Sequence, residues 1–87
     1  MRNENNAYKR KLIGFSIALH RKAQGFTQEQ LAEGIGKSLS YVSHIEADGK
    51  DANPTLDTLI DIAEFLKVEL HKLLNIENLI SGNVKGT

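Results

Sequence analysis

The chain has 87 residues, a formal net charge of zero and no cysteine. This length supports one modest hydrophobic core, and the absence of thiols excludes disulfides and thiolate metal sites. No apolar run approaches the roughly 18 residues that a membrane span needs, and the polar start lacks the apolar centre of a signal peptide. We therefore expect one cytoplasmic domain.

The charges are unevenly distributed along the chain. Basic side chains outnumber acidic ones six to one over residues 1–24, whereas acidic ones outnumber basic ones six to three from Asp51 onward. Such a distribution would let the basic end contact DNA while the acidic half holds a protein partner. A solvated surface with chance clustering of charges explains the same pattern equally well.

The hydrophobic periodicity is helical along nearly the whole chain. Residues 1–7 are expected to form a flexible arm, and residues 8–24 the first helix, which ends at Gly25. We expect the apolar face of this helix to include five residues: Leu12, Ile13, Phe15, Ile17 and Leu19.

The second helix begins after Thr27, because Gln30 follows at the spacing of a capping box. Gly34 and Gly36 are expected to end it. Ser38 then caps a third helix over residues 39–47.

The second half of the chain predicts two more helices. Residues 48–53 are rich in turn formers, and Pro54 and Thr55 start a fourth helix. Its inward side chains are expected to be Leu56, Leu59, Ile60, Ala63 and Leu66. A short fifth helix follows over residues 68–74, so the predicted domain spans residues 8–74, with a tail from 75 to 87. The predicted fold class is therefore all-α, a compact five-helix bundle.

The segment from Thr27 to Glu46 has the features of two helices joined by a tight turn. Ala32 is a small residue where the backbones approach, and Gly36 tolerates the positive φ of the turn. Lys37 departs from the pattern, because a hydrophobic residue is usual there. The apolar contacts between the two helices are expected from Leu31, Ile35, Val42 and Ile45. An ordinary α-hairpin in a helical bundle is the alternative.

The stretch GFTQEQLAEGIGKSLSYVSHIEADGK resembles the phage-repressor type of helix-turn-helix, the Xre/Cro-like family, and the resemblance extends over about residues 13–74. It implies a lambda-repressor-like bundle that regulates transcription, usually as a dimer. It also implies a partly buried ion pair between Arg21 and Glu46. Two departures concern phosphate contacts: Ala47-Asp48 replaces a basic residue and glycine, and the loop before Pro54 is about two residues longer than usual.

In such a pair the third helix lies in the major groove, and its outward side chains contact bases. The predicted base contacts are Gln28, Leu39, Ser40, Ser43 and His44. The predicted phosphate contacts are Thr27, Tyr41, Lys50, Lys9, Arg10 and Lys11. The alternatives are that the two serines only face solvent and that Tyr41 only packs on the second helix. The three histidines have no metal-site spacing, so we expect no metal and no cofactor.

A dimer is expected because one small domain buries too little surface to hold an operator alone. The predicted dimer surface consists of Leu70, Leu73, Leu74, Ile76, Leu79 and Ile80, unless these residues close the bundle of the monomer.

The predicted function is sequence-specific regulation of transcription at an inverted-repeat operator, as a repressor or a restriction–modification controller. The alternative is an antitoxin-type module that binds a toxin through its acidic C-terminal half. No nucleophile–base pair or phosphate-binding glycine loop indicates an enzyme.

Overall fold

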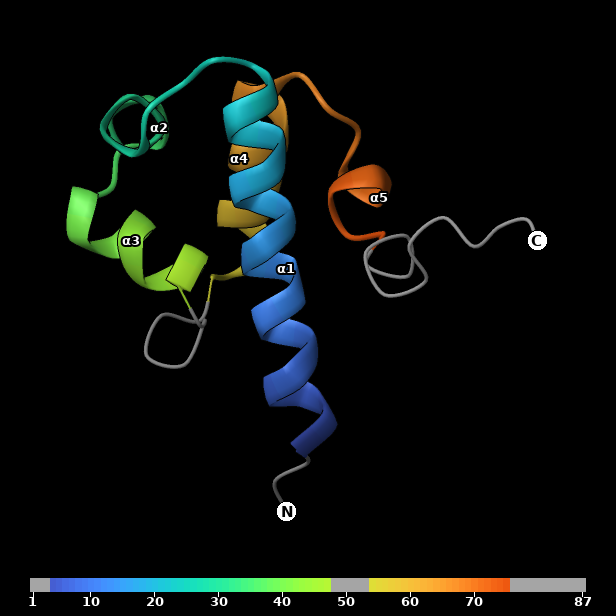
Figure 1. Ribbon diagram of the computed structural model, residues 1–87. Helices are drawn as coiled ribbons and strands as arrows, with labels where there is room; N and C mark the ends of the chain where they lie inside the picture. The colour runs from blue at the N-terminus through green and yellow to red at the C-terminus, as the bar shows by residue number, and fades with distance from the viewer. Residues whose placement is uncertain (1–3, 48–53, 76–87) are drawn as a thin grey trace.

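The computed structural model describes residues 4–47 and 54–75. Within these ranges α-helices are joined by turns and loops and there is no strand, which confirms the predicted all-α class (Figure 1). The helices are α1 (Glu4–Ala23), α2 (Gln28–Ile35), α3 (Leu39–Ala47), α4 (Leu56–Leu66) and α5 (Leu70–Leu73).

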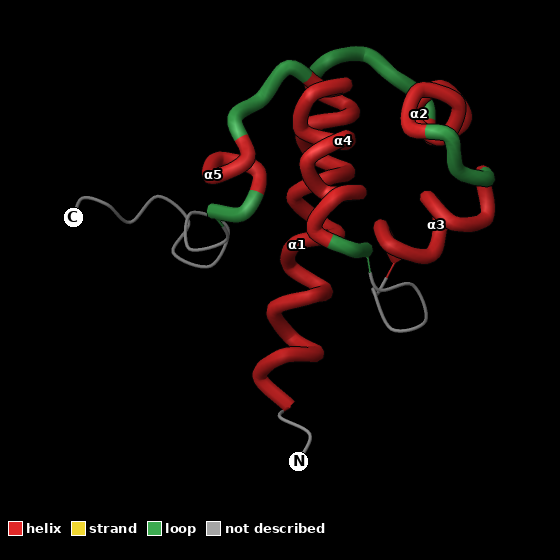
Figure 2. The backbone as a smooth tube through the Cα atoms, turned by 180° about the vertical axis from the view of Figure 1, so that it is seen from behind, coloured by secondary structure: helices red, strands yellow, loops and turns green. Residues whose placement is uncertain are grey.

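The helices are arranged around α1, the longest of them (Figure 1). Helices α2 and α3 lie on one side of α1 and α5 lies on the other, while α4 packs behind it (Figures 1 and 2). The N-terminal turns of α1 extend beyond the rest of the bundle (Figure 1). This arrangement leaves α3 at the edge of the molecule, where an external partner has access to it.

The core lies where α1 to α5 converge, and each helix contributes to it. In the helix-turn-helix, Leu31, Ala32, Val42 and Ile45 are buried as predicted, and Ile35 is half-buried. The remaining core residues are Ile17, Ile62, Ala63, Leu66 and Leu73. Ser16 ties α5 to α1, because its hydroxyl donates to the Leu73 carbonyl at 2.7 Å.

The predicted apolar face of α1 was too wide. Phe15 and Leu19 are 55% and 46% exposed, whereas Ile17 is fully buried. At 100° per residue, Leu12, Phe15 and Leu19 fall with Tyr8 on the side opposite Ile17, so they form a second stripe that faces outward. The helix also begins at Glu4, so residues 4–7 form its first turn rather than a flexible arm.

The predicted inward face of α4 also needs a correction. Leu56 is 62% exposed because it is the first residue of the helix, beyond the edge of the core. Ile62, which the sequence pattern did not single out, is fully buried. The buried face follows the spacing of Leu59, Ile62, Ala63 and Leu66, with Leu59 only half-buried.

Two glycines place the helices. Gly36 ends α2 in the left-handed conformation at φ 71°, as predicted, while Gly34 lies inside the helix rather than at its end. Gly14 lets α1 approach α3 closely, because a Cβ atom at this position would collide with the Ile45 carbonyl oxygen. The sequence motif did not reveal the role of Gly14, yet this close approach sets the position of α3.

Candidate nucleic-acid interface

Helix α2 begins with the predicted capping box. The Thr27 hydroxyl accepts from the Gln30 amide at 3.0 Å, and the Gln30 side chain accepts from the Thr27 amide at 2.9 Å. Both bonds fix the start of α2, and Thr27 itself remains exposed. The helix N-terminus, which favours a phosphate, is thus held at the surface.

Helix α3 exposes the side chains expected to face DNA. Its start is capped by Ser38, whose hydroxyl accepts from the Tyr41 amide at 3.0 Å. Val42 and Ile45 are buried against the core, which turns the opposite side of the helix to solvent. Leu39, Ser40 and His44 are exposed there, and Leu39 is 46% exposed.

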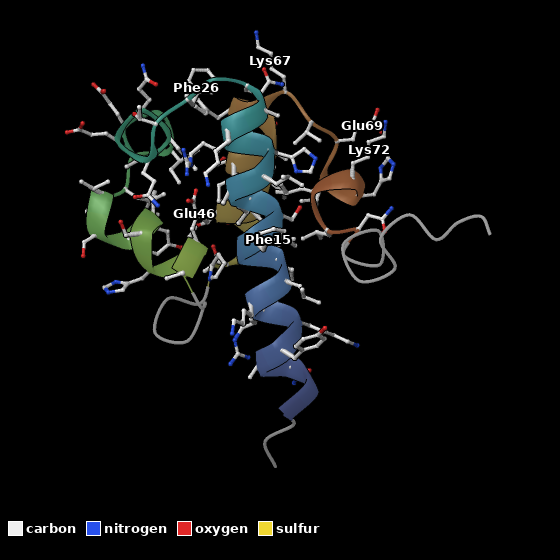
Figure 3. All side chains as sticks on the ribbon, viewed as in Figure 1. Phe15, Phe26, Glu46, Lys67, Glu69 and Lys72 are labelled. Atoms are coloured by element: carbon white, nitrogen blue, oxygen red, sulfur yellow. The ribbon has the colours of Figure 1, made fainter. Side chains whose placement is uncertain are left out.

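A buried ion pair connects α3 to α1. The Arg21 Nε donates to Glu46 Oε2 at 2.7 Å, and its Nη2 donates to Glu46 Oε1 at 2.9 Å. The side chains are only 9% and 5% exposed, and Figure 3 shows Glu46 between α3 and α1. The Arg21 Nη1 also donates to the Phe26 carbonyl at 2.8 Å, so one guanidinium holds α1, α3 and the loop before α2 together.

The ion pair continues into a hydrogen-bond chain that reaches the side of α3 predicted to face DNA. Gln28 Nε2 donates to Glu46 Oε1 at 2.9 Å, and the Ser43 hydroxyl donates to Gln28 Oε1 at 3.0 Å. Gln28 and Ser43 are therefore half-buried and already bonded to the protein. Sequence reasoning placed both residues at the interface but missed the chain, because its members are 15 to 25 positions apart.

Tyr41 in the first turn of α3 lies close to Lys37, which precedes the helix. Tyr41 is half-buried and packs against the core, and the Lys37 ammonium lies 5.3 Å from the centre of its ring. This contact is a cation–π interaction, and it explains how a lysine is tolerated where a hydrophobic residue is usual. Lys37 is exposed, so it adds a positive charge beside α3.

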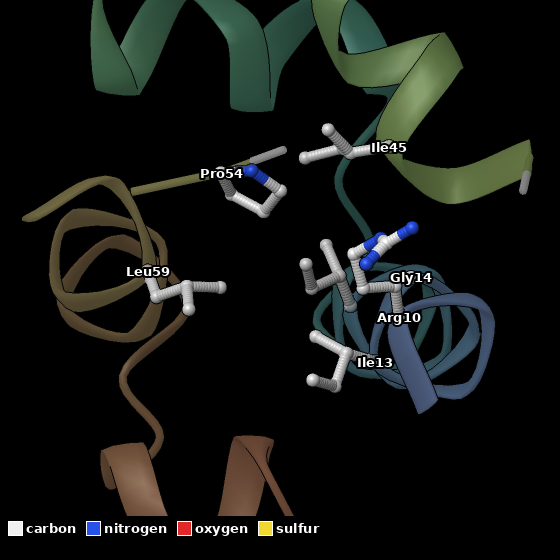
Figure 4. A pocket seen from close by; sticks show the side chains of 7 residues that line it. Arg10, Ile13, Gly14, Ile45, Pro54 and Leu59 are labelled. Atoms are coloured by element: carbon white, nitrogen blue, oxygen red, sulfur yellow. The ribbon is translucent and has the colours of Figure 1, made fainter. Parts of the chain in front are cut away.

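The basic residues near the N-terminus lie on α1 rather than on an arm. Lys9 and Lys11 are exposed, and Arg10 is half-buried. Arg10 lies at a small apolar cavity of about 80 Å³ between α1, α3 and Pro54 (Figure 4). Lys50, another predicted phosphate contact, lies outside the described residues.

The predicted dimer surface is only partly available. Leu73 is fully buried in the core of the monomer, so its assignment to a surface was wrong. Leu70 and Leu74 are half-buried, and Ile76, Leu79 and Ile80 lie outside the described residues. Large exposed apolar side chains lie instead on the outward stripe of α1, and Tyr8 and Phe15 are examples. The apolar residues of this stripe follow one another at spacings of four, three and four positions from Tyr8 to Leu19, and this periodicity was the sequence signal for the stripe.

Residues 4–47 and 54–75 contain no group of three or more His, Asp or Glu side chains placed to hold a metal ion. His20 instead bonds locally, with its Nδ1 2.9 Å from the Ser16 carbonyl oxygen. None of the described helices is long and apolar enough to cross a membrane.

Comparisons with known proteins agree with this geometry. A helix-turn-helix family model matches residues 17–73. The HTH-type transcriptional regulator SlrR of Bacillus subtilis is 37% identical over 75 residues, which cover 86% of this chain and 49% of SlrR. The control protein C.SmaI of Serratia marcescens is 33% identical over 70 residues, which cover 80% of this chain and 81% of that protein.

A phage protein is similar as well. The immunity repressor protein of Bacillus phage phi105 is 38% identical over 68 residues, covering 78% of this chain and 46% of the repressor. The chain spans about half the length of SlrR and of the SinR regulators that it also matches. The matched region contains α2 to α5 and the C-terminal turns of α1. The chain therefore belongs to the helix-turn-helix family of transcriptional regulators, as its resemblance to phage-repressor-type proteins predicted.

Proposed function

We propose that this protein binds a double-stranded DNA operator as a homodimer, with α3 in the major groove, and thereby regulates transcription. The observation that carries the proposal is the exposure of Leu39, Ser40 and His44 on a helix whose opposite side is buried. Recognition helices of this motif contact base edges through such side chains. Operator binding would place the protein in the cytoplasm.

The exposed residues of α3 suit different parts of a base pair. Leu39 can pack on a thymine methyl group, and His44 can donate to a guanine acceptor. Ser40 is exposed, so its hydroxyl can rotate to donate or to accept. The helix contains no Arg, Asn or Gln for a bidentate base contact, and we therefore expect modest discrimination between sites.

Phosphate contacts are proposed around this helix. Thr27 at the start of α2 and Tyr41 on α3 are the nearest candidates, and Lys37 adds charge there. Lys9 and Lys11 are exposed on the part of α1 that extends from the bundle. Contacts of this kind orient the protein on the duplex and carry little sequence information.

The homodimer is proposed because two recognition helices would match two half-sites about 34 Å apart. Leu70 and Leu74 are half-buried near the C-terminal end of the described chain, and we propose that they contribute to the contact. A two-fold dimer would require an inverted-repeat operator.

The class of regulator is best supported as a repressor or a restriction–modification controller. Occupation of a promoter by the dimer would block polymerase. C.SmaI is named a control protein, and the match covers 81% of its length, so a controller of this kind is a specific second candidate. The relatives described above give no support to the antitoxin alternative, in which the acidic C-terminal half would bind a toxin.

The proposal is tested by selecting bound duplexes from a random DNA pool, followed by binding titrations at one fixed salt concentration. The double variant Ser40→Ala/His44→Ala should lose preference for the selected site and keep its helical circular dichroism spectrum. His71→Ala is the matched control, because His71 is exposed on α5, on the other side of α1. Unchanged site preference in the double variant would reject α3 as the recognition helix.

A further inference from the structure

Ser43 has a defined hydrogen-bond polarity before any DNA is bound. We propose that Ser43 contacts DNA only as a hydrogen-bond acceptor, so that its partner is the exocyclic amine of an adenine or a cytosine. The inference rests on the proposed function, since it concerns the DNA-facing side of α3. It goes further by naming the chemical group that one residue recognises.

The polarity originates at Arg21. A guanidinium group has only donors, and two of its nitrogens point at the Glu46 carboxylate, at 2.7 and 2.9 Å. Glu46 must therefore accept. Because the Glu46 side chain is 5% exposed and its Oε1 lies 2.9 Å from both Arg21 and Gln28, this carboxylate is surrounded by donors.

Gln28, on α2, transmits the hydrogen-bond polarity from Glu46 to Ser43, and both of these residues lie on α3. An amide has a donor end and an acceptor end, and only the donor end, Nε2, can bond to the Glu46 carboxylate. Its acceptor end, Oε1, then faces Ser43 at 3.0 Å. The orientation of the amide thus follows from its partner, without any freedom to flip.

Ser43 completes the chain. A serine hydroxyl has one proton and two lone pairs, and the proton of Ser43 is donated to Gln28 Oε1. Only lone pairs remain for a partner outside the protein. In the major groove the donors are adenine N6 and cytosine N4, whereas guanine N7 and O6 and thymine O4 are acceptors.

Phosphate oxygens are also acceptors, so the same polarity excludes a phosphate contact by Ser43. Ser40, one turn earlier on α3, is exposed and is free of this restriction. To donate to DNA, the Ser43 hydroxyl would have to rotate away from Gln28 Oε1 and leave this half-buried oxygen without its donor. We therefore expect the acceptor polarity to persist in the complex.

The test is a double-mutant cycle between Ser43 and single atoms of the DNA. An operator is first selected with the wild-type protein, and the base pair whose preference is lost in Ser43→Ala is identified. Duplexes are then made without the exocyclic amine at that pair, with purine in place of adenine or 2-pyrimidinone in place of cytosine. A second set lacks an acceptor, with 7-deazaguanine in place of guanine or 5-methyl-2-pyrimidinone in place of thymine.

Removal of the amine should weaken binding of the wild-type protein by about twofold to tenfold, the effect of one neutral hydrogen bond. It should weaken Ser43→Ala no further. Removal of an acceptor should affect both proteins equally. Ser40→Ala is the matched control and should respond to amine removal at this pair as the wild-type protein does.

Gln28→Ala provides a second readout, because it frees the proton of Ser43 while leaving the serine in place. With its proton free, Ser43 can donate as well as accept, so this variant should tolerate guanine or thymine in place of the amine-bearing base with a smaller loss of binding than the wild-type protein. Coupling of Ser43 to an acceptor atom, or an operator with no pair that couples to Ser43, would overturn this inference alone. A pool from which the wild-type protein enriches no sequence would overturn the proposed function as well.

Discussion

Replacement of Glu46 by alanine tests whether the interface depends on a buried charge network. The carboxylate accepts from two nitrogens of Arg21 and from Gln28, at 2.7 to 2.9 Å. The Arg21 side chain is 9% exposed. After the substitution its charge would stay buried and keep only the Phe26 carbonyl among these bonds.

The expected loss in the free energy of unfolding is about 3–5 kcal/mol, the cost of removing one partner of a buried ion pair. A domain of this size changes its Tm by about 4–8 °C for each kcal/mol, so Tm should fall by more than about 10 °C. This loss is a large part of the roughly 5–15 kcal/mol that stabilises a natural domain. The fold as a whole is therefore sensitive to Glu46.

Urea unfolding followed by circular dichroism at 222 nm measures the effect, with an unchanged m-value as the check on two-state behaviour. The double variant Arg21→Met/Glu46→Leu should recover much of the loss, because it removes the charges together. Recovery stays incomplete because the Phe26 carbonyl also loses its donor. Glu33→Ala, an exposed acid on α2, should stay within about 0.5 kcal/mol of the wild-type protein.

A loss below about 1 kcal/mol for Glu46→Ala would refute the reasoning, since that value is typical of a solvent-exposed ion pair. A double variant that is as unstable as Glu46→Ala would refute the second step. In that case the damage would come from lost packing rather than from the unpaired charge of Arg21.

Further substitutions test the backbone geometry and the proposed dimer. Gly14→Ala should cost about 1–3 kcal/mol in urea unfolding, because its Cβ would meet the Ile45 carbonyl; a neutral result would mean that α1 and α3 are farther apart. Gly36→Ala should cost about 1–2 kcal/mol because φ is 71°, and unchanged stability would contradict the left-handed cap. Leu74→Asp should weaken self-association in sedimentation equilibrium, whereas Phe15→Asp should leave it unchanged. The reverse result would move the dimer surface to the exposed stripe of α1.

The helix-turn-helix was predictable because its determinants are local. The capping box at Thr27 and the left-handed residue at Gly36 are specified by neighbours a few positions away. Val42 and Ile45 then determine which side of α3 is buried. Each constraint acts within one helix or one turn, so a single sequence is sufficient to locate it.

Helix α1 was harder to predict because it has apolar residues on two sides. The outward stripe of Phe15 and Leu19 is as regular as the buried one, and periodicity alone does not decide which of them the core uses. That choice depends on where other helices dock. Gly14 belongs to the same class, since its contact with Ile45 spans 31 positions of the sequence.

In the proposed complex, Gln28 connects the stability of the domain to its choice of DNA site. Its amide bonds to the buried Glu46 at one end and to Ser43 at the other. A substitution at Gln28 would therefore alter the ion pair and the polarity of Ser43 together. Leu39, Ser40 and His44 are exposed, so exchanging them would change the proposed DNA contact at little cost in stability. We infer that a related protein with a different operator would differ at these three positions while keeping the Arg21–Glu46–Gln28 network.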